Sequence, residues 1–206
     1  STPKPSSAAS DVYKRQDRHW LVPHFEKMLY DQAMIAMAYT EAFHITGDKV
    51  FENTTKEIFN YVLRDLTAPN GGFYSAEDAD SEGEEGKFYT WTKKEIEEVL
   101  GSSLGKDYIN TFSIENDGNY KDESTREKNG KNIPHLNNYN FYNQTSIDAA
   151  REKLFDKRKN RIHPLKDDKI HNDWNRLMIA AFERASVIFK DDTYIKSAIK
   201  SSQFVL

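Results

Sequence analysis

The sequence contains the same helical hairpin pattern twice, at an offset of 144 residues (178 − 34). In the first copy, a helix that is apolar on all faces is followed by a turn at Gly47-Asp48 and a helix with one apolar stripe. The second copy has the same order, and Met178-Ile179-Ala180 aligns with Met34-Ile35-Ala36 without a gap. Two helices joined by a short turn form an αα-hairpin, so the repeat predicts inner and outer helices of an α/α toroid. The alternative is a chance similarity between two amphipathic hairpins.

Apolar periodicity indicates where these helices begin and end. We expect the first hairpin to consist of helices at 23–44 and 49–66, with Pro23 at the first helical position, where its missing N–H costs nothing. In the second copy, residues 177–182 are apolar all round, Asp191-Asp192 makes the turn, and a striped helix follows. A helix that is apolar along most of its length and polar only in its first turns is expected to be buried along that length, with its first turns facing a pocket.

The residues between the two copies have a different pattern. Two short strands, at 73–74 and 88–91, are expected on either side of an acidic loop at 77–85. Thr92-Lys-Lys-Glu95 is a capping box and predicts the start of a helix. Helices are expected at 92–100, near 105–112 and at 146–161. The expected fold is mainly α, with a small β-hairpin insertion.

Composition excludes several classes of function. The 206 residues carry a net charge of −4 with both signs mixed, which argues against a nucleic-acid surface. No apolar run approaches the roughly 20 residues of a membrane span. Cys is absent, so disulfides and thiolate metal sites are excluded within this chain. We predict no metal, no cofactor, no nucleic-acid partner and no membrane partner, and the sequence does not determine the compartment.

The chain is expected to have a tail and one domain. Residues 1–16 are rich in Ser, Ala and Pro, lack periodicity, and are predicted to be disordered. Their abrupt join to a strongly patterned stretch suggests a remnant of cloning or sequence assembly. Residues 17–206 are interpreted as an internal fragment of one α/α barrel domain.

Ionisable residues near the predicted pocket suggest proton transfer. His24 is a candidate general acid or base because the unperturbed pKa of the histidine side chain lies near neutrality, and in a helix it would share a face with Asp31. Glu77 and Asp78 are candidate acid and base, since two carboxylates perform these roles in glycosidases. The alternatives are a histidine that only hydrogen-bonds near a helix start and a solvated acidic loop. A calcium loop is a weaker alternative, because Tyr89 stands where the last ligand would be.

Aromatic side chains near these groups are candidates for stacking on sugar rings, although large aromatics also pack cores. The repeat aligns Tyr30 and Asp31 with Trp174 and Asn175, which predicts that they lie at the same height on two inner helices. Asp173 is either a ligand-binding residue or the helix N-cap. The residues expected to hold a substrate are Tyr30, Asp31, Tyr74, Asp80, Trp91, Asp173, Trp174 and Asn175.

Four segments together resemble the signatures of the spermatogenesis-associated, thioredoxin-domain-containing protein family, in the family's order. They are Trp20–Asp31, Gly71–Gly83 with Gly86–Trp91, Gly118–Tyr120 with Lys131–His135, and 153–179 with its Asp173-Trp-Asn-Arg-Leu-Met-Ile179 end. The resemblance implies part of a six-hairpin (α/α)6 barrel, similar to N-acylglucosamine 2-epimerases, cellobiose epimerases and inverting glycosidases. It also implies a thioredoxin-like domain in cis, which is missing from this sequence. One departure is Arg176, where the family usually has Gly.

Two classes of function follow from the residues and the resemblance. In the first, the barrel is an enzyme acting on a small carbohydrate-like ligand, with His24 and Glu77 or Asp78 transferring protons. The residues do not distinguish epimerase or isomerase chemistry from hydrolysis. In the second, the barrel is a non-catalytic module that binds a client or ligand for the thioredoxin-like domain. A third possibility is a barrel that keeps the fold without activity.

Overall fold

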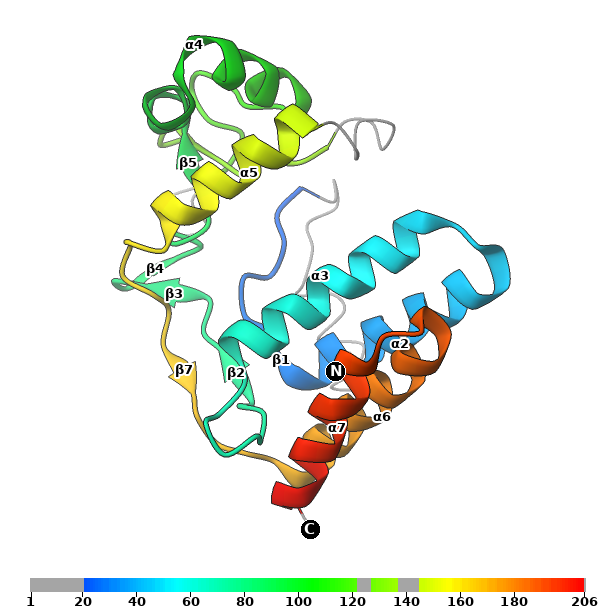
Figure 1. Cartoon of the computed structure of the whole chain (residues 1–206). Coiled ribbons are helices and arrows are strands. Elements are labelled where there is room, and N and C mark those ends of the chain that lie inside the picture. Colours follow the sequence, from blue (N-terminus) through cyan, green and yellow to red (C-terminus); the bar gives the residue numbers. More distant parts are fainter. Residues whose placement is uncertain (1–20, 122–126, 137–144, 206) are drawn as a thin grey trace, which may run out of the picture. The chain divides into compact units, whose positions relative to one another are not determined.

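The computed structural model describes residues 21–121, 127–136 and 145–205 (Figure 1). The predicted tail at 1–16 lies outside these residues. The chain divides into two compact units. We call Glu26–Asp78 with Leu165–Leu206 the helical unit, and Ser1–Phe25 with Ala79–Pro164 the mixed unit. Each unit is described by itself.

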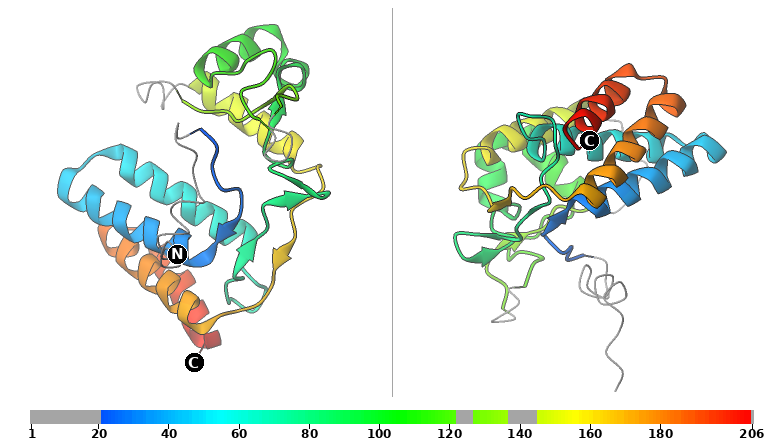
Figure 2. Two further views of the ribbon diagram at one scale, coloured as in Figure 1. Left: turned by 180° about the vertical axis from the view of Figure 1, so that it is seen from behind. Right: turned by 90° about the horizontal axis from the view of Figure 1, so that it is seen from below.

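The helical unit consists of two helical hairpins that pack side by side (Figures 1 and 2). The ring centroids of Tyr30 and Trp174, near the starts of the two inner helices, are 4.9 Å apart. Those of Phe43 and Phe189, near the ends, are 5.5 Å apart, so the inner helices run parallel. Tyr30 and Trp174 are also offset by 144 residues (174 − 30), which confirms the register of the predicted repeat. The helices are α2 (Leu29–Thr46), α3 (Lys49–Asp65), α6 (Asn172–Phe189) and α7 (Asp192–Val205).

Both hairpin turns form where the sequence predicts them. Gly47 adopts the left-handed conformation (φ 70°), which glycine tolerates, and its N–H donates to Phe43. Asp48 then caps α3 by accepting the N–H of Val50 at 2.9 Å. In the second hairpin Lys190 takes the left-handed position (φ 55°). These local hydrogen bonds explain why the turns could be predicted from the sequence.

The hairpins share one core, in which Phe59 and Phe182 stack with centroids 4.4 Å apart. Helix α2 contributes a single buried stripe of small residues that includes Ala33 and Ala36. The prediction that its body is buried on every face is wrong, because Met34 is 55% and Ile35 44% exposed. Within the unit α2 packs mainly on α3 and α6, and part of its surface stays exposed.

Short strands lie before the helix starts and change the predicted beginning of the first helix. Strands β1 (Lys27–Met28), β2 (Ala76–Glu77) and β7 (Lys166–Asp167) form an antiparallel sheet in the order β1-β2-β7. The backbone before Leu29 is therefore extended, and the expected helix start at Pro23 is wrong. His24 precedes the helix, so the helical face that it was expected to share with Asp31 does not exist.

Among its described residues, the mixed unit contains two small antiparallel strand pairs and two helices. The predicted strands at 73–74 and 88–91 are largely wrong, because the acidic loop itself forms the β3–β4 hairpin. The capping box of Thr92 and Glu95 is confirmed, and Gly101 (φ 73°, ψ 178°) kinks α4 between the two helices predicted there. The elements are β3 (Asp80–Ser81), β4 (Glu84–Glu85), β5 (Trp91–Thr92), α4 (Lys93–Thr111), β6 (Lys131–Asn132) and α5 (Thr145–Arg158).

The described chain is mainly α with small β elements, which confirms the predicted fold class, and its two packed hairpins are those expected of part of an α/α barrel. Within the described ranges, no helix combines the length and apolar character needed to cross a membrane.

Candidate functional site

One extended segment ties the starts of the two inner helices together. At its beginning, the backbone N–H and C=O of Phe73 bond the side chain of Asn175 in α6, at 2.8 and 3.0 Å. Two residues later, the C=O of Ser75 accepts the N–H of Leu29 at 2.8 Å. The segment then becomes β2, which pairs with β1 before α2. The starts of α2 and α6 and segment 73–77 therefore form one structural feature, which we call the helix-start site.

An aromatic pair occupies this site. The rings of Tyr30 and Trp174 meet edge to face, at 4.9 Å and 64°, and both side chains are half-buried. The His171 ring lies 4.6 Å from Trp174 on its own helix start. Half-buried aromatic rings combine a fixed position with an exposed surface, as stacking on a small ligand requires. The alignment of the two repeats predicted that Tyr30 and Trp174 lie at the same height, but not their ring contact or the addition of His171.

Glu77 places a carboxylate in the same segment. It is only 4% exposed, although it belongs to a short strand of a three-stranded sheet. Burial raises the pKa of the Tyr61 hydroxyl far above its ordinary value of 10.0, and the negative charge of Glu77 raises it further. The Lys27 ammonium lies 6.0 Å from the Tyr61 ring centroid. A buried carboxylate beside a tyrosine that stays neutral is suited to holding or moving a proton. Tyr61 was not among the residues predicted from the sequence.

Asn175, predicted to bind substrate, has the contacts of a structural residue. It is fully buried, and besides Phe73 its amide bonds the C=O of His171 at 3.0 Å. Its neighbour Asp173 is exposed in the first turn of α6. The interpretation of Asp173 as the N-cap is wrong, because the N-cap residue is His171, which makes no side-chain cap bond. Arg176, the departure from the family pattern, is exposed.

The remaining predicted residues of the helical unit lie near the same segment. Asp31 is half-buried in the first turn of α2. Tyr74 is half-buried, with the Lys166 ammonium 6.0 Å from its ring centroid. Asp78 is exposed just after β2, and its N–H donates to Leu165 at 2.8 Å. These positions are compatible with ligand contacts at the edge of the helix-start site, which stay predictions.

Three predicted residues belong to the mixed unit instead. His24 is half-buried in extended backbone, and Asp80 is exposed in β3. Trp91 is 3% exposed, and the Arg161 guanidinium lies over its ring at 4.0 Å, which makes it a packing residue. Proton transfer by His24 together with Glu77 stays a prediction, since the two residues belong to different units. Across the described ranges, no three His, Asp or Glu side chains gather closely enough to hold a metal ion.

Comparisons with known proteins give the family. No family model matches the chain. Spermatogenesis-associated protein 20 of Homo sapiens is 35% identical over 92% of the chain, and that of Rattus norvegicus is 34% identical over 92%. An uncharacterized protein of Caenorhabditis elegans is 30% identical over 90% of the chain. Among solved structures, a D-mannose isomerase covers 98% of this chain and 52% of its own, at 13% identity and a TM-score of 0.31.

The sequence similarity extends over nearly the whole chain, which itself spans about 28% of the length of the mammalian relatives. The chain belongs to the family of spermatogenesis-associated protein 20.

Proposed function

We propose that the helix-start site binds a small polyhydroxylated molecule, such as a sugar, and transfers a proton on it through Glu77. The observation that carries this proposal is the contact of Tyr30 with Trp174 at the start of two parallel helices. The segment fastened across those starts also carries Glu77, so a stacking surface and a buried carboxylate share one scaffold. Both helix starts also present partial positive charge, which favours ligand oxygens.

The chemistry assigned to Glu77 follows from its surroundings. Removal of a carbon-bound proton, as in epimerisation or isomerisation, needs one base and a way to return the proton. Tyr61 keeps its own proton because its pKa is raised, so it can donate a hydrogen bond but does not serve as the base. Hydrolysis would need a second carboxylate, for which Asp78, Asp31 and Asp173 are candidates in this unit.

The test is sugar binding and turnover by the full-length protein, using a panel of hexoses, N-acetylhexosamines and disaccharides. Trp174→Ala and Tyr30→Ala should weaken sugar binding up to about tenfold, the upper range for an aromatic pair contact. Glu77→Gln should leave binding within about twofold and lower turnover by roughly 100-fold or more. Saturation-transfer NMR measures the binding, and product analysis measures the turnover.

Two control variants remove the same groups elsewhere. Tyr39→Ala deletes an aromatic ring of α2 that packs on Phe51, about 13 Å along the helix from Tyr30. Glu183→Gln neutralises an exposed carboxylate of α6. If the panel does not bind, or if the control variants match the site variants, the proposed site is wrong. Sugar binding without turnover by the parent protein would favour the non-catalytic ligand-binding module.

A further inference from the structure

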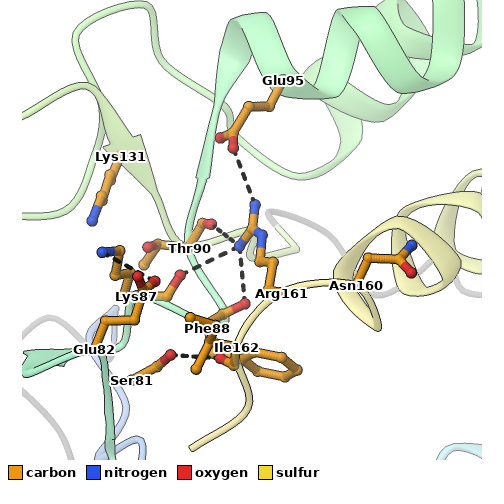
Figure 3. Close-up of a pocket in the computed structure, with 10 residues that line it drawn as sticks. All are labelled: Ser81, Glu82, Lys87, Phe88, Thr90, Glu95, Lys131, Asn160, Arg161 and Ile162. Atoms are coloured by element: carbon orange, nitrogen blue, oxygen red, sulfur yellow. Dashed lines mark hydrogen bonds and ion pairs between the residues drawn. The ribbon is translucent and has the colours of Figure 1, made fainter.

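The mixed unit contains a cavity that is separate from the helix-start site (Figure 3). Its volume is about 360 Å³, within the range of small-molecule sites. Three cationic and two anionic side chains stand among the lining residues. The lining residues are Ser81, Glu82, Lys87, Phe88, Thr90, Glu95, Lys131, Asn160, Arg161 and Ile162.

Arg161 builds one wall of this cavity. Its guanidinium donates to the carbonyl oxygens of Lys87, Phe88 and Thr90 at 3.3, 2.9 and 2.7 Å. A further bond of 3.3 Å goes to the Glu95 carboxylate. Both terminal nitrogens of Arg161 thus have hydrogen-bond partners within the protein. Its role is to fix the 87–90 backbone, which leaves the two lysines as the cations that face a ligand.

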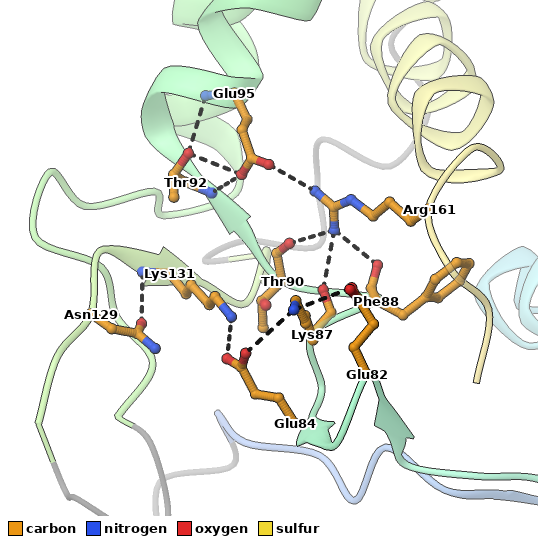
Figure 4. Close-up of polar contacts among 10 residues, drawn as sticks. All are labelled: Glu82, Glu84, Lys87, Phe88, Thr90, Thr92, Glu95, Asn129, Lys131 and Arg161. Atoms are coloured by element: carbon orange, nitrogen blue, oxygen red, sulfur yellow. Dashed lines mark hydrogen bonds and ion pairs between the residues drawn. The ribbon is translucent and has the colours of Figure 1, made fainter. Parts of the chain in front are cut away.

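The two lysines converge on one carboxylate (Figure 4). Lys131 makes an ion pair with Glu84, and the Lys87 ammonium lies 4.0 Å from the same carboxylate and 3.1 Å from Glu82. These side chains are partly exposed, so their ion pairs are weak and exchangeable. The Glu84 carboxylate therefore occupies the position that an external anion would take between two ammonium groups.

Thr90 adds a hydroxyl whose bonding is incomplete. The residue is 3% exposed, and its Oγ1 atom has no hydrogen-bond partner in the part of the chain that the structure describes. Figures 3 and 4 both draw Thr90 between the Arg161 guanidinium and the side chains of Lys87 and Lys131. A buried unpaired hydroxyl is unfavourable, and an oxygen atom of a ligand would satisfy it.

From these features we propose that the cavity is a binding site for a phosphate group, held by Lys87, Lys131 and the Thr90 hydroxyl. Two ammonium groups and one hydroxyl line the same cavity, and three separate donors match the peripheral oxygens of a tetrahedral phosphate better than the two oxygens of a carboxylate. Glu84 acts as an internal competitor, which the phosphate displaces from the lysines. The site is independent of the proposed sugar chemistry, since it uses other residues in the other unit.

The experiment titrates the protein with inorganic phosphate at constant ionic strength and follows the backbone amide shifts of Thr90 and Lys131 by NMR. Lys131→Met should weaken phosphate binding about tenfold, the factor for one hydrogen bond to a charged group. Thr90→Val should weaken it several-fold, whereas Thr90→Ser keeps the hydroxyl and should bind like the parent. Glu84→Gln removes the competing charge and should strengthen binding about tenfold.

Matched control variants and a second anion, acetate, distinguish a specific phosphate site from a general effect of charge. Lys94→Met and Glu97→Gln change the same charges on exposed positions of α4 and should leave phosphate binding within about twofold. Tighter binding to the Glu84→Gln variant supports the proposal even if a lysine variant fails to fold. The proposal is overturned if phosphate leaves both amides unshifted, if Lys94→Met weakens binding as much as Lys131→Met, or if acetate binds as tightly as phosphate.

Discussion

Replacement of Asn175 by Ala tests whether this residue holds the helix-start site together. The substitution removes the partners of two buried backbone groups, the N–H and the C=O of Phe73. The C=O of His171 keeps a partner, because the backbone N–H of residue 175 also bonds it at 3.0 Å. Each orphaned group costs about 1–3 kcal/mol, so the free energy of unfolding should fall by roughly 4 kcal/mol. That is a large share of the 5–15 kcal/mol typical of a domain.

Urea titration followed by far-UV circular dichroism measures this effect. With a slope of about 2 kcal/mol per molar urea, the unfolding midpoint of the helical unit should drop by roughly 2 M. Asn172→Ala makes the same chemical change at an exposed position of the same helix and should leave the midpoint within about 0.3 M. A loss below about 1 kcal/mol for Asn175→Ala would refute the structural role. A stable Asn175→Ala variant with weakened sugar binding would instead restore the predicted substrate contact.

Two further predictions concern the mixed unit. Gly118 and Gly83 both have positive φ, but a Cβ at Gly118 would lie 2.4 Å from the backbone oxygen of Lys131, while one at Gly83 meets nothing within 4 Å. Gly83→Ala should therefore cost about 1 kcal/mol and Gly118→Ala several, as measured by thermal unfolding; equal losses would contradict the steric argument. Burial raises the pKa of Tyr108 to about 12 from 10.0, so the unfolded chain loses this proton first. The protonated Tyr108 hydroxyl contributes to the free energy of unfolding in full below pH 10, and this contribution should decline by about 3 kcal/mol as pH rises toward 12. The Tyr108→Phe variant should not show that decline in urea titrations across this pH range.

The features that the sequence predicted well depend on neighbouring residues. The turns at Gly47-Asp48 and Asp191-Asp192 and the capping box at Thr92 are each closed by hydrogen bonds within a few positions. The repeat predicted that Tyr30 and Trp174 lie at equal height on two inner helices, and their ring contact agrees with this.

The errors arise where a distant segment intervenes. The helix start moved from Pro23 to Leu29 because β2, some fifty residues later, pairs with Lys27 and Met28 and holds them extended. Alternation of polar and apolar residues did not reveal β3 and β4, since strands of two residues are too short to show a period.

The sequence by itself determined the hairpin repeat, its register, the capping box at Thr92 and the family, because these are written in local periodicity and short motifs. Only the tertiary structure decided that Asn175 bonds Phe73, 102 positions away, and that Arg161 and Lys131 approach Thr90 to enclose a cavity. The physical reason is that a side chain's partners across the chain depend on the path of the backbone. The local sequence around a buried polar group does not specify which distant group becomes its hydrogen-bond partner.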